Sequence, residues 1–201
     1  MRYGLLADIH EDTVFLAAAL DRFQRESVDR VVVLGDIFER GRALEGTTQM
    51  LREAGAIGVW GNHDFGLSHN PHDDIRARFS PECMAFMTSL RPILEFEDCL
   101  VTHVEPYRDH EDIYELWSFG EPDSPAKSFA ARPHRLMLHG HHHRWVVHDP
   151  NGLVEWDRVR PLHLEPANRY LIQVGAVCDG RCGVLDTSAN LLIPFDLRDG
   201  D

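Results

Sequence analysis

The chain has 201 residues, of which 33 are Asp or Glu and 20 are Lys or Arg, so its formal charge is −13 with histidine neutral. Hydrophobic residues make up 43% and charged residues 26%, which is typical of a soluble globular protein and excludes fibrous and disordered chains. The acidic balance opposes long-range attraction to duplex nucleic acid, so a phosphate-bearing substrate needs a local cation. We expect one domain over residues 1–201.

The sequence contains no apolar run near the roughly 18 residues that cross a bilayer, and its first residues lack the apolar stretch of a signal peptide. We therefore expect a cytoplasmic protein without a membrane partner, and we make no prediction of its oligomeric state. The four cysteines form no Cys-x-x-Cys pair, which favours reduced structural thiols. Cys178 and Cys182, four positions apart in a Gly-rich stretch, also permit a metal or redox role.

The first 62 residues alternate between short apolar runs and amphipathic runs. Strands are predicted over 3–7, 31–34 and 56–60, and helices from Asp12 or Thr13 onward and over 43–54. Gly55 is a suitable C-terminal cap for the second helix. This βαβαβ order predicts an α/β fold with a mostly parallel sheet that is covered on both faces.

The remainder of the chain is less regular and becomes rich in strands. A helix is predicted over 81–90, a hairpin over 93–96 and 100–102, a helix near 112–117, and strands over 136–138, 145–148, 170–174, 183–185 and 191–195. The last two strands are expected to form a closing hairpin. The segment 104–134, rich in acidic residues, proline and aromatics, is predicted to be a long functional excursion.

Five predicted strands end in Asp, Asn or His. The polar residues at or just after these ends are Asp8, His10, Asp36, Asn62, His103, His141 and His143. Each alone has a structural explanation, such as a helix cap, a turn or a buried histidine. Together they favour a ligand site, because ligands gather beyond the carboxyl ends of strands in open sheets. Oxygen donors with imidazoles suit a metal, and seven donors favour two ions over one.

At this point the sequence resembles a known family, the calcineurin-like metallophosphoesterases. The matching blocks are Asp8-x-His10, Gly35-Asp36, Gly61-Asn62-His63-Asp64, His103 and Gly140-His141-x-His143, in that order. The stretch 174–186 is also similar to the small bacterial and archaeal phosphodiesterase branch. The resemblance implies a two-sheet α/β sandwich flanked by helices, with metals at one edge.

The resemblance further implies two divalent ions, drawn from Mn, Fe, Zn, Ni, Co or Mg. It assigns Asp8, His10 and His143 to the first ion, Asn62, His103 and His141 to the second, and Asp36 to both. It implies hydrolysis of a phosphodiester or small nucleotide by attack of a metal-bridging hydroxide, with His63 steadying the phosphate and protonating the leaving oxygen. A phosphomonoesterase or a dinucleoside polyphosphate hydrolase is the alternative. A non-catalytic scaffold or a metal-storage protein has less support, since every ligand position and His63 are intact.

Two further residues are predicted to assist catalysis. Glu39 is favoured over Asp64 as the carboxylate that orients His63. The run from Gly35 to Gly41 resembles the Gly-Asp-x-x-Asp-Arg-Gly block of the phosphoprotein phosphatase and dinucleoside tetraphosphatase branch. That resemblance implies that Arg40 contacts a substrate phosphate, the alternative being a solvated turn arginine.

Three features near these blocks leave alternatives open. Glu11 stands where many relatives have glycine, and its charge is expected to narrow the site mouth or to repel polyanions. His139 and His142 are interpreted as neighbours of the ligands, not as ligands. The aromatic residues Tyr107, Tyr114, Trp117 and Phe119 either form a pocket wall suited to base stacking or pack the excursion onto the core.

Overall fold

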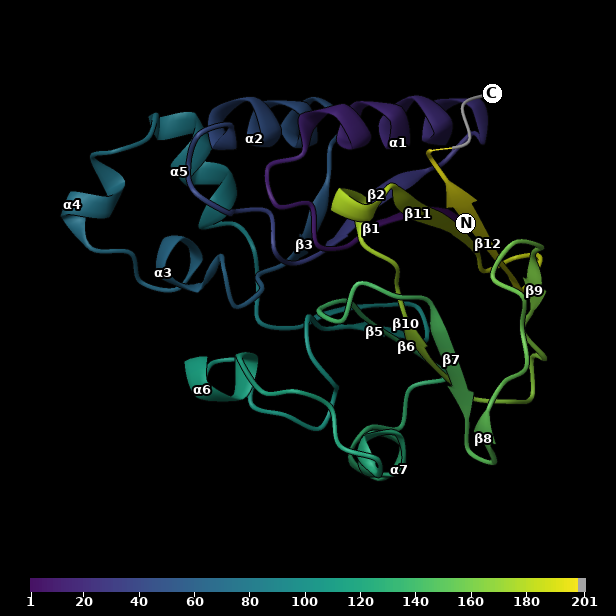
Figure 1. Cartoon of the computed structure of the whole chain (residues 1–201). Coiled ribbons are helices and arrows are strands. Elements are labelled where there is room, and N and C mark those ends of the chain that lie inside the picture. The colour runs from purple at the N-terminus through teal and green to yellow at the C-terminus, as the bar shows by residue number, and fades with distance from the viewer. Residues whose placement is uncertain (199–201) are drawn as a thin grey trace.

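The computed structural model describes residues 1–198 and has two six-stranded sheets packed face to face, with helices on the outside (Figure 1). The helices are α1 (Thr13–Arg25), α2 (Leu44–Glu53), α3 (Phe65–Ser68), α4 (Asp73–Arg76), α5 (Pro81–Met87), α6 (Ile113–Leu116), α7 (Ser124–Ala131) and the 3-10 turn η1 (Val177–Asp179). The strands are β1 (Arg2–Leu6), β2 (Arg30–Leu34), β3 (Ile57–Val59), β4 (Leu94–Phe96), β5 (Cys99–Val101), β6 (Leu136–His139), β7 (Val146–Asp149), β8 (Gly152–Leu153), β9 (Leu162–His163), β10 (Tyr170–Gln173), β11 (Arg181–Asp186) and β12 (Leu191–Asp196).

The first sheet has the strand order β3-β2-β1-β11-β12-β9. Its first three strands are parallel, as the βαβαβ pattern predicts, and helices α1 and α2 supply the crossovers on the outer face (Figure 1). The carboxylate of Asp12 accepts hydrogen bonds from the backbone N–H groups of Val14 and Phe15, so Asp12 is the N-cap of α1. The expected closing hairpin is confirmed as β11 and β12.

The second sheet has the order β4-β5-β6-β10-β7-β8, with parallel strands β5, β6 and β10 at its centre. Antiparallel neighbours flank the parallel strands in both sheets. The expectation of one mostly parallel sheet is therefore wrong, because strands that follow the βαβαβ segment form a second sheet and join both sheets as antiparallel neighbours. The two-sheet sandwich that the family resemblance implies is confirmed.

Alternating side chains of the first sheet form two cores. Leu5, Val32 and Leu34 point toward the second sheet, whereas Leu6 and Val33 point toward α1 and α2. Burial on both faces explains why these strands are continuous apolar runs. The core between the two sheets holds them face to face. The carboxyl ends of β1 and β2 therefore lie opposite those of β5 and β6, at one edge of the sandwich.

Several short elements have no counterpart in the predictions: α3, α4, α7, β8 and β9. Helix α7 covers the outer face of the second sheet, where Phe129 packs against Leu100, Met137 and Leu171. Within the described residues 1–198, every helix is too short or too polar to cross a membrane.

Candidate metal centre

The polar residues predicted at the strand ends lie together at the edge where the two sheets meet. Asp8 follows β1, Asp36 follows β2, and His103 follows β5. The loops are tied directly, since the backbone N–H of Asp8 donates to the Gly35 carbonyl at 3.1 Å. The N–H of His141 donates to the Asp8 carboxylate at 3.0 Å, which joins the first sheet to the second.

The backbone at these residues is left-handed. The φ angles are 52° at Asp8, 47° at His10, 54° at Asp36, 73° at His141 and 55° at His143. Non-glycine residues seldom adopt this conformation, which costs of order 1–3 kcal/mol each and clusters at functional sites. Five of the seven predicted ligands thus lie on strained backbone, which indicates that their side-chain directions matter more than local stability.

Two glycines allow the loops to approach this closely. A Cβ atom at Gly35, where φ is +92°, would lie 2.5 Å from Nδ1 of His103, and one at Gly61 would lie 2.1 Å from Oδ1 of Asp36. The buried carboxylate of Asp64 then accepts N–H groups from Ile37, Phe38 and Gly61, which fixes the loop after β2 against the loop after β3. Asp64 is therefore a brace for these loops, and it is not the partner of His63.

Four side chains form what we call the inner cluster: Asp36, Asn62, His103 and His141. Nε2 of His103 lies 2.9 Å from Oδ1 of Asn62 and 3.4 Å from Oδ2 of Asp36. Nδ1 of His141 lies 3.0 Å from the same Asn62 oxygen. Donor atoms about 2.0–2.1 Å from one ion stand about 3.0–3.4 Å from each other, so these separations fit a metal site.

Each imidazole of the inner cluster, in His103 and His141, donates a hydrogen bond from the ring nitrogen that points away from the cluster. Nδ1 of His103 donates to the Leu34 carbonyl at 2.8 Å, and Nε2 of His141 donates to the Ser118 carbonyl at 3.2 Å. The inward nitrogens of the neutral rings therefore carry lone pairs that face carboxylate and amide oxygens. The inner cluster thus brings together four acceptor atoms, which are one carboxylate oxygen, one amide oxygen and two ring nitrogens. Such a group of acceptors is stabilised by a cation, and these donor types fit a divalent metal ion.

The pKa values of the buried groups indicate the same demand for positive charge. Burial lowers the pKa of His103, but the nearby Asp36 carboxylate outweighs burial and raises it well above the usual range. Burial alone would raise the pKa of Asp36, yet the charge and hydrogen bond of His103 hold it well below normal. Positive charge beside the Asp36 carboxylate is therefore favoured at this position, which a divalent metal ion would supply.

The outer cluster comprises Asp8, His10, Asp36 and His143, and thus shares Asp36 with the inner one. Nε2 of His10 lies 3.7 Å from Oδ2 of Asp36, and Nε2 of His143 lies 3.8 Å from Oδ1 of Asp8. Burial raises the pKa of the Asp8 carboxyl, which is fully enclosed, while the side chain of His143 is 36% exposed. The outer cluster is therefore wider and more open than the inner cluster.

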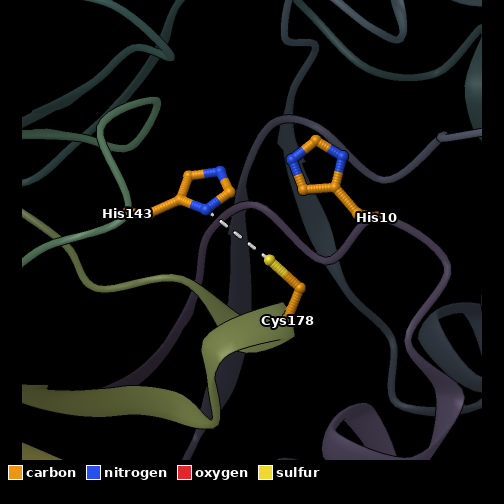
Figure 2. Close-up of side chains that lie close together, drawn as sticks. All are labelled: His10, His143 and Cys178. Carbon is orange, nitrogen blue, oxygen red and sulfur yellow. Dashed lines mark hydrogen bonds between the residues drawn. The ribbon is translucent and has the colours of Figure 1, made fainter.

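Figure 2 shows that Cys178, on the turn η1, points toward the space between His10 and His143. Its Sγ lies 3.7 Å from Nδ1 of His143, and a carboxylate oxygen of Asp179 lies 3.5 Å from the same nitrogen. Burial raises the pKa of the thiol to about 12, and its Sγ lies within 4.8 Å of ring nitrogens of His10 and His143, so Cys178 is a further group at the outer cluster that could hold a metal ion. The Gly-rich spacing in the sequence gave only a weak signal for this position.

His63 lies beside the outer cluster with Glu39. Oε2 of Glu39 is 3.5 Å from Nδ1 of His63 and 3.3 Å from Nδ1 of His10, so one carboxylate faces both rings. The backbone N–H of His63 donates to Oδ1 of Asp36 at 3.0 Å. The Arg40 side chain is 69% exposed, with its Nε 3.5 Å from Oε1 of Glu39, which places it at the mouth of the site.

Glu11 has a role that sequence reasoning did not anticipate. Its Oε1 accepts the N–H groups of Glu39, Arg40 and Gly41 at 3.0, 3.0 and 2.5 Å, and its Oε2 accepts that of Ala43 at 2.8 Å. Burial would raise the pKa of Glu11, but these four hydrogen bonds lower it. Its charge is thus directed at the backbone of residues 39–43, and it is Glu11 that holds Glu39 in place.

The flanking histidines lie behind the metal centre. His139 is buried, and Nε2 of His142 lies 3.3 Å from a carboxylate oxygen of Glu105. The ring of His142 also lies beside that of His141, with their centroids 4.8 Å apart, so His142 borders the inner cluster on the side of Glu105.

Comparisons with known proteins agree with this geometry. Residues 1–188 match the model of the calcineurin-like phosphoesterase superfamily domain. The chain therefore belongs to this superfamily, and it is a metal-dependent phosphoester hydrolase. A protein of Methanocaldococcus jannaschii, the uncharacterized protein MJ0912, is 24% identical over 98% of this chain and 83% of its own length.

Solved structures share the fold. A metallophosphoesterase from Sphaerobacter thermophilus superposes with a TM-score of 0.81 at 21% identity, over 98% of this chain and 88% of its own. An archaeal phosphodiesterase superposes with a TM-score of 0.56 at 15% identity, over 97% of this chain and 99% of its own. A candidate diadenosine tetraphosphatase superposes with a TM-score of 0.62 at 19% identity, over 99% of this chain and 95% of its own.

Proposed function

We propose that this protein hydrolyses phosphodiesters or small nucleotides at a centre of two divalent cations. The inner cluster of Asp36, Asn62, His103 and His141 would hold one cation, and the outer cluster of Asp8, His10, Asp36 and His143 the other. When bound, the cations supply Lewis-acid activation of water and neutralise charge at phosphorus. The observation that carries the proposal is the inner cluster, where four acceptor atoms face one another and require positive charge.

The remaining residues act on the substrate. With Nδ1 of His63 directed at Glu39, Nε2 is the nitrogen that is available to the substrate. It can hold a phosphate oxygen and deliver a proton to the leaving oxygen. Arg40, whose exposed side chain lies beside Glu39, would contact a further phosphate, and this role would favour the alternative of a dinucleoside polyphosphate substrate.

The test is hydrolysis by metal-stripped protein that is re-supplied with Mn²⁺, Ni²⁺, Co²⁺, Zn²⁺ or Mg²⁺. We expect metal-dependent cleavage of bis-p-nitrophenyl phosphate that exceeds cleavage of p-nitrophenyl phosphate. His63→Ala should lower kcat by about 100- to 10,000-fold without loss of bound metal. His163→Ala, on an exposed histidine far along the chain, is the control and should leave the rate unchanged.

Faster cleavage of the monoester would shift the assignment to a phosphomonoesterase. Absence of turnover with every metal, despite two bound ions per chain, would contradict a general phosphoesterase. Full activity of His63→Ala would remove the role proposed for His63.

A further inference from the structure

Two large aromatic side chains stand exposed beside the metal centre. Trp117 is 52% exposed, and its ring centroid lies 5.1 Å from that of His63. Phe119 is 80% exposed, and its ring lies 6.3 Å from that of His141. One aromatic residue therefore flanks the proposed proton donor, and the other flanks the inner cluster.

The core of the protein does not account for these two side chains. On helix α6 it is Leu116 that is fully buried and that joins the main hydrophobic core. Tyr107 is half-buried, with its hydroxyl 3.2 Å from that of Ser124 and the ammonium of Lys127 over its ring. Packing of the excursion thus uses Leu116 and Tyr107, while Trp117 and Phe119 remain turned to solvent.

The backbone that carries the two aromatics is held in place. The guanidinium of the buried Arg108 donates to Glu105 at 2.8 Å, to Glu115 at 2.9 Å and to the carbonyl of Phe119 at 3.1 Å. The intervening carbonyl of Ser118 accepts the hydrogen bond from the inner cluster. Because folding has already ordered this segment, a ligand would not have to order its backbone.

Space for a ring lies next to Phe119, in a cavity whose lining does not include Trp117. Phe119 lines a cavity of about 380 Å³ together with His142, Arg144 and Gln173. This volume is in the range of small-molecule sites. The net charge of −13 opposes a long nucleic acid, so the occupant that fits is small.

We propose that Trp117 and Phe119 bind an aryl or nucleobase ring of the substrate, next to its phosphate. This inference rests on the function proposed above, because it places the ring relative to the phosphate site. A planar ring can stack on exposed aromatic side chains whatever its hydrogen-bonding groups. The residues therefore select for ring-bearing esters over esters of plain sugars or alkyl groups.

The test compares binding of 5′-AMP, ribose 5-phosphate and inorganic phosphate to the Mn²⁺-loaded full chain by calorimetry. We expect 5′-AMP to bind about 5- to 100-fold more tightly than ribose 5-phosphate. The double variant Trp117→Ala/Phe119→Ala should reduce this ratio to below about 2-fold, whereas Trp117→Phe should largely keep it. Tyr114→Ala is the matched control, since Tyr114 is 83% exposed on helix α6, just before Trp117 in the chain, and it should leave the ratio unchanged.

Equal binding of 5′-AMP and ribose 5-phosphate would overturn the ring proposal while leaving the phosphoesterase intact. A ratio that survives the double variant would overturn it as well. If inorganic phosphate and both esters fail to bind, the proposed function itself is wrong and the ring proposal falls with it.

Discussion

The inner and outer clusters share Asp36 but differ in spacing and in burial. Contacts between donor atoms in the inner cluster are 2.9–3.4 Å, whereas those in the outer cluster are 3.7–3.8 Å. His103 is fully buried, while the side chain of His143 is 36% exposed. This difference shows that side chains at strand ends beside the core between the sheets are held closer together than side chains on an exposed loop. His103 is an example of the first kind and His143 of the second.

The largest effect is expected from removing the side chain that both clusters share. Asp36→Ala should abolish binding of both ions and lower turnover by at least about 1,000-fold, because its carboxylate faces His10 and His103 alike. Metal content by mass spectrometry and the rate with added Mn²⁺ are the measurements. Asp186→Asn, a buried carboxylate paired with Arg2 elsewhere in the first sheet, is the control and should keep both ions. Two ions retained by Asp36→Ala would contradict a shared ligand.

A smaller effect should separate the clusters. His143→Ala should lose the outer ion alone, whereas His103→Ala should lose the inner ion, and titration with a chelator should remove the outer ion first from the unmodified protein. Asp179→Asn, which changes one of the two groups that face Nδ1 of His143, should weaken binding of the outer ion by about 10-fold and leave binding of the inner ion unchanged. Simultaneous release of both ions in every variant would show that the two clusters form one cooperative site.

The smallest effect is expected from Glu11, which contacts neither cluster through its carboxylate but holds residues 39–43. Glu11→Ala removes the acceptor of four backbone N–H groups. We expect the free energy of unfolding to fall by about 2–4 kcal/mol. We also expect kcat to fall by about 10-fold, because Glu39 then no longer orients His63. Urea unfolding and kinetics on the metal-loaded protein measure the two effects.

Glu11→Gln keeps one acceptor oxygen and should lie between the native protein and Glu11→Ala in both measurements. A loss of stability with unchanged kcat would mean that Glu11 supports the fold alone and that Glu39 needs no such support.

Much of the scaffold follows from local patterns. The β-branched run 31–34 and the capping residue Asp12 identify β2 and α1, because both signals act within a few neighbouring residues. Short helices such as α3 and α4 carry too few residues for a periodic pattern. The pairing of β11 with β1 spans most of the chain, so no local pattern predicts it.

The sequence alone determined that polar residues follow the apolar strands and that their order matches a metallophosphoesterase. Only the tertiary structure decided that Glu11 turns to the backbone, that Asp64 braces two loops, and that Trp117 and Phe119 face solvent beside the metal centre. The physical reason is that a residue type fixes which chemistry a side chain offers. Packing of the two sheets fixes where that side chain points and which groups, distant along the chain, lie within reach of it.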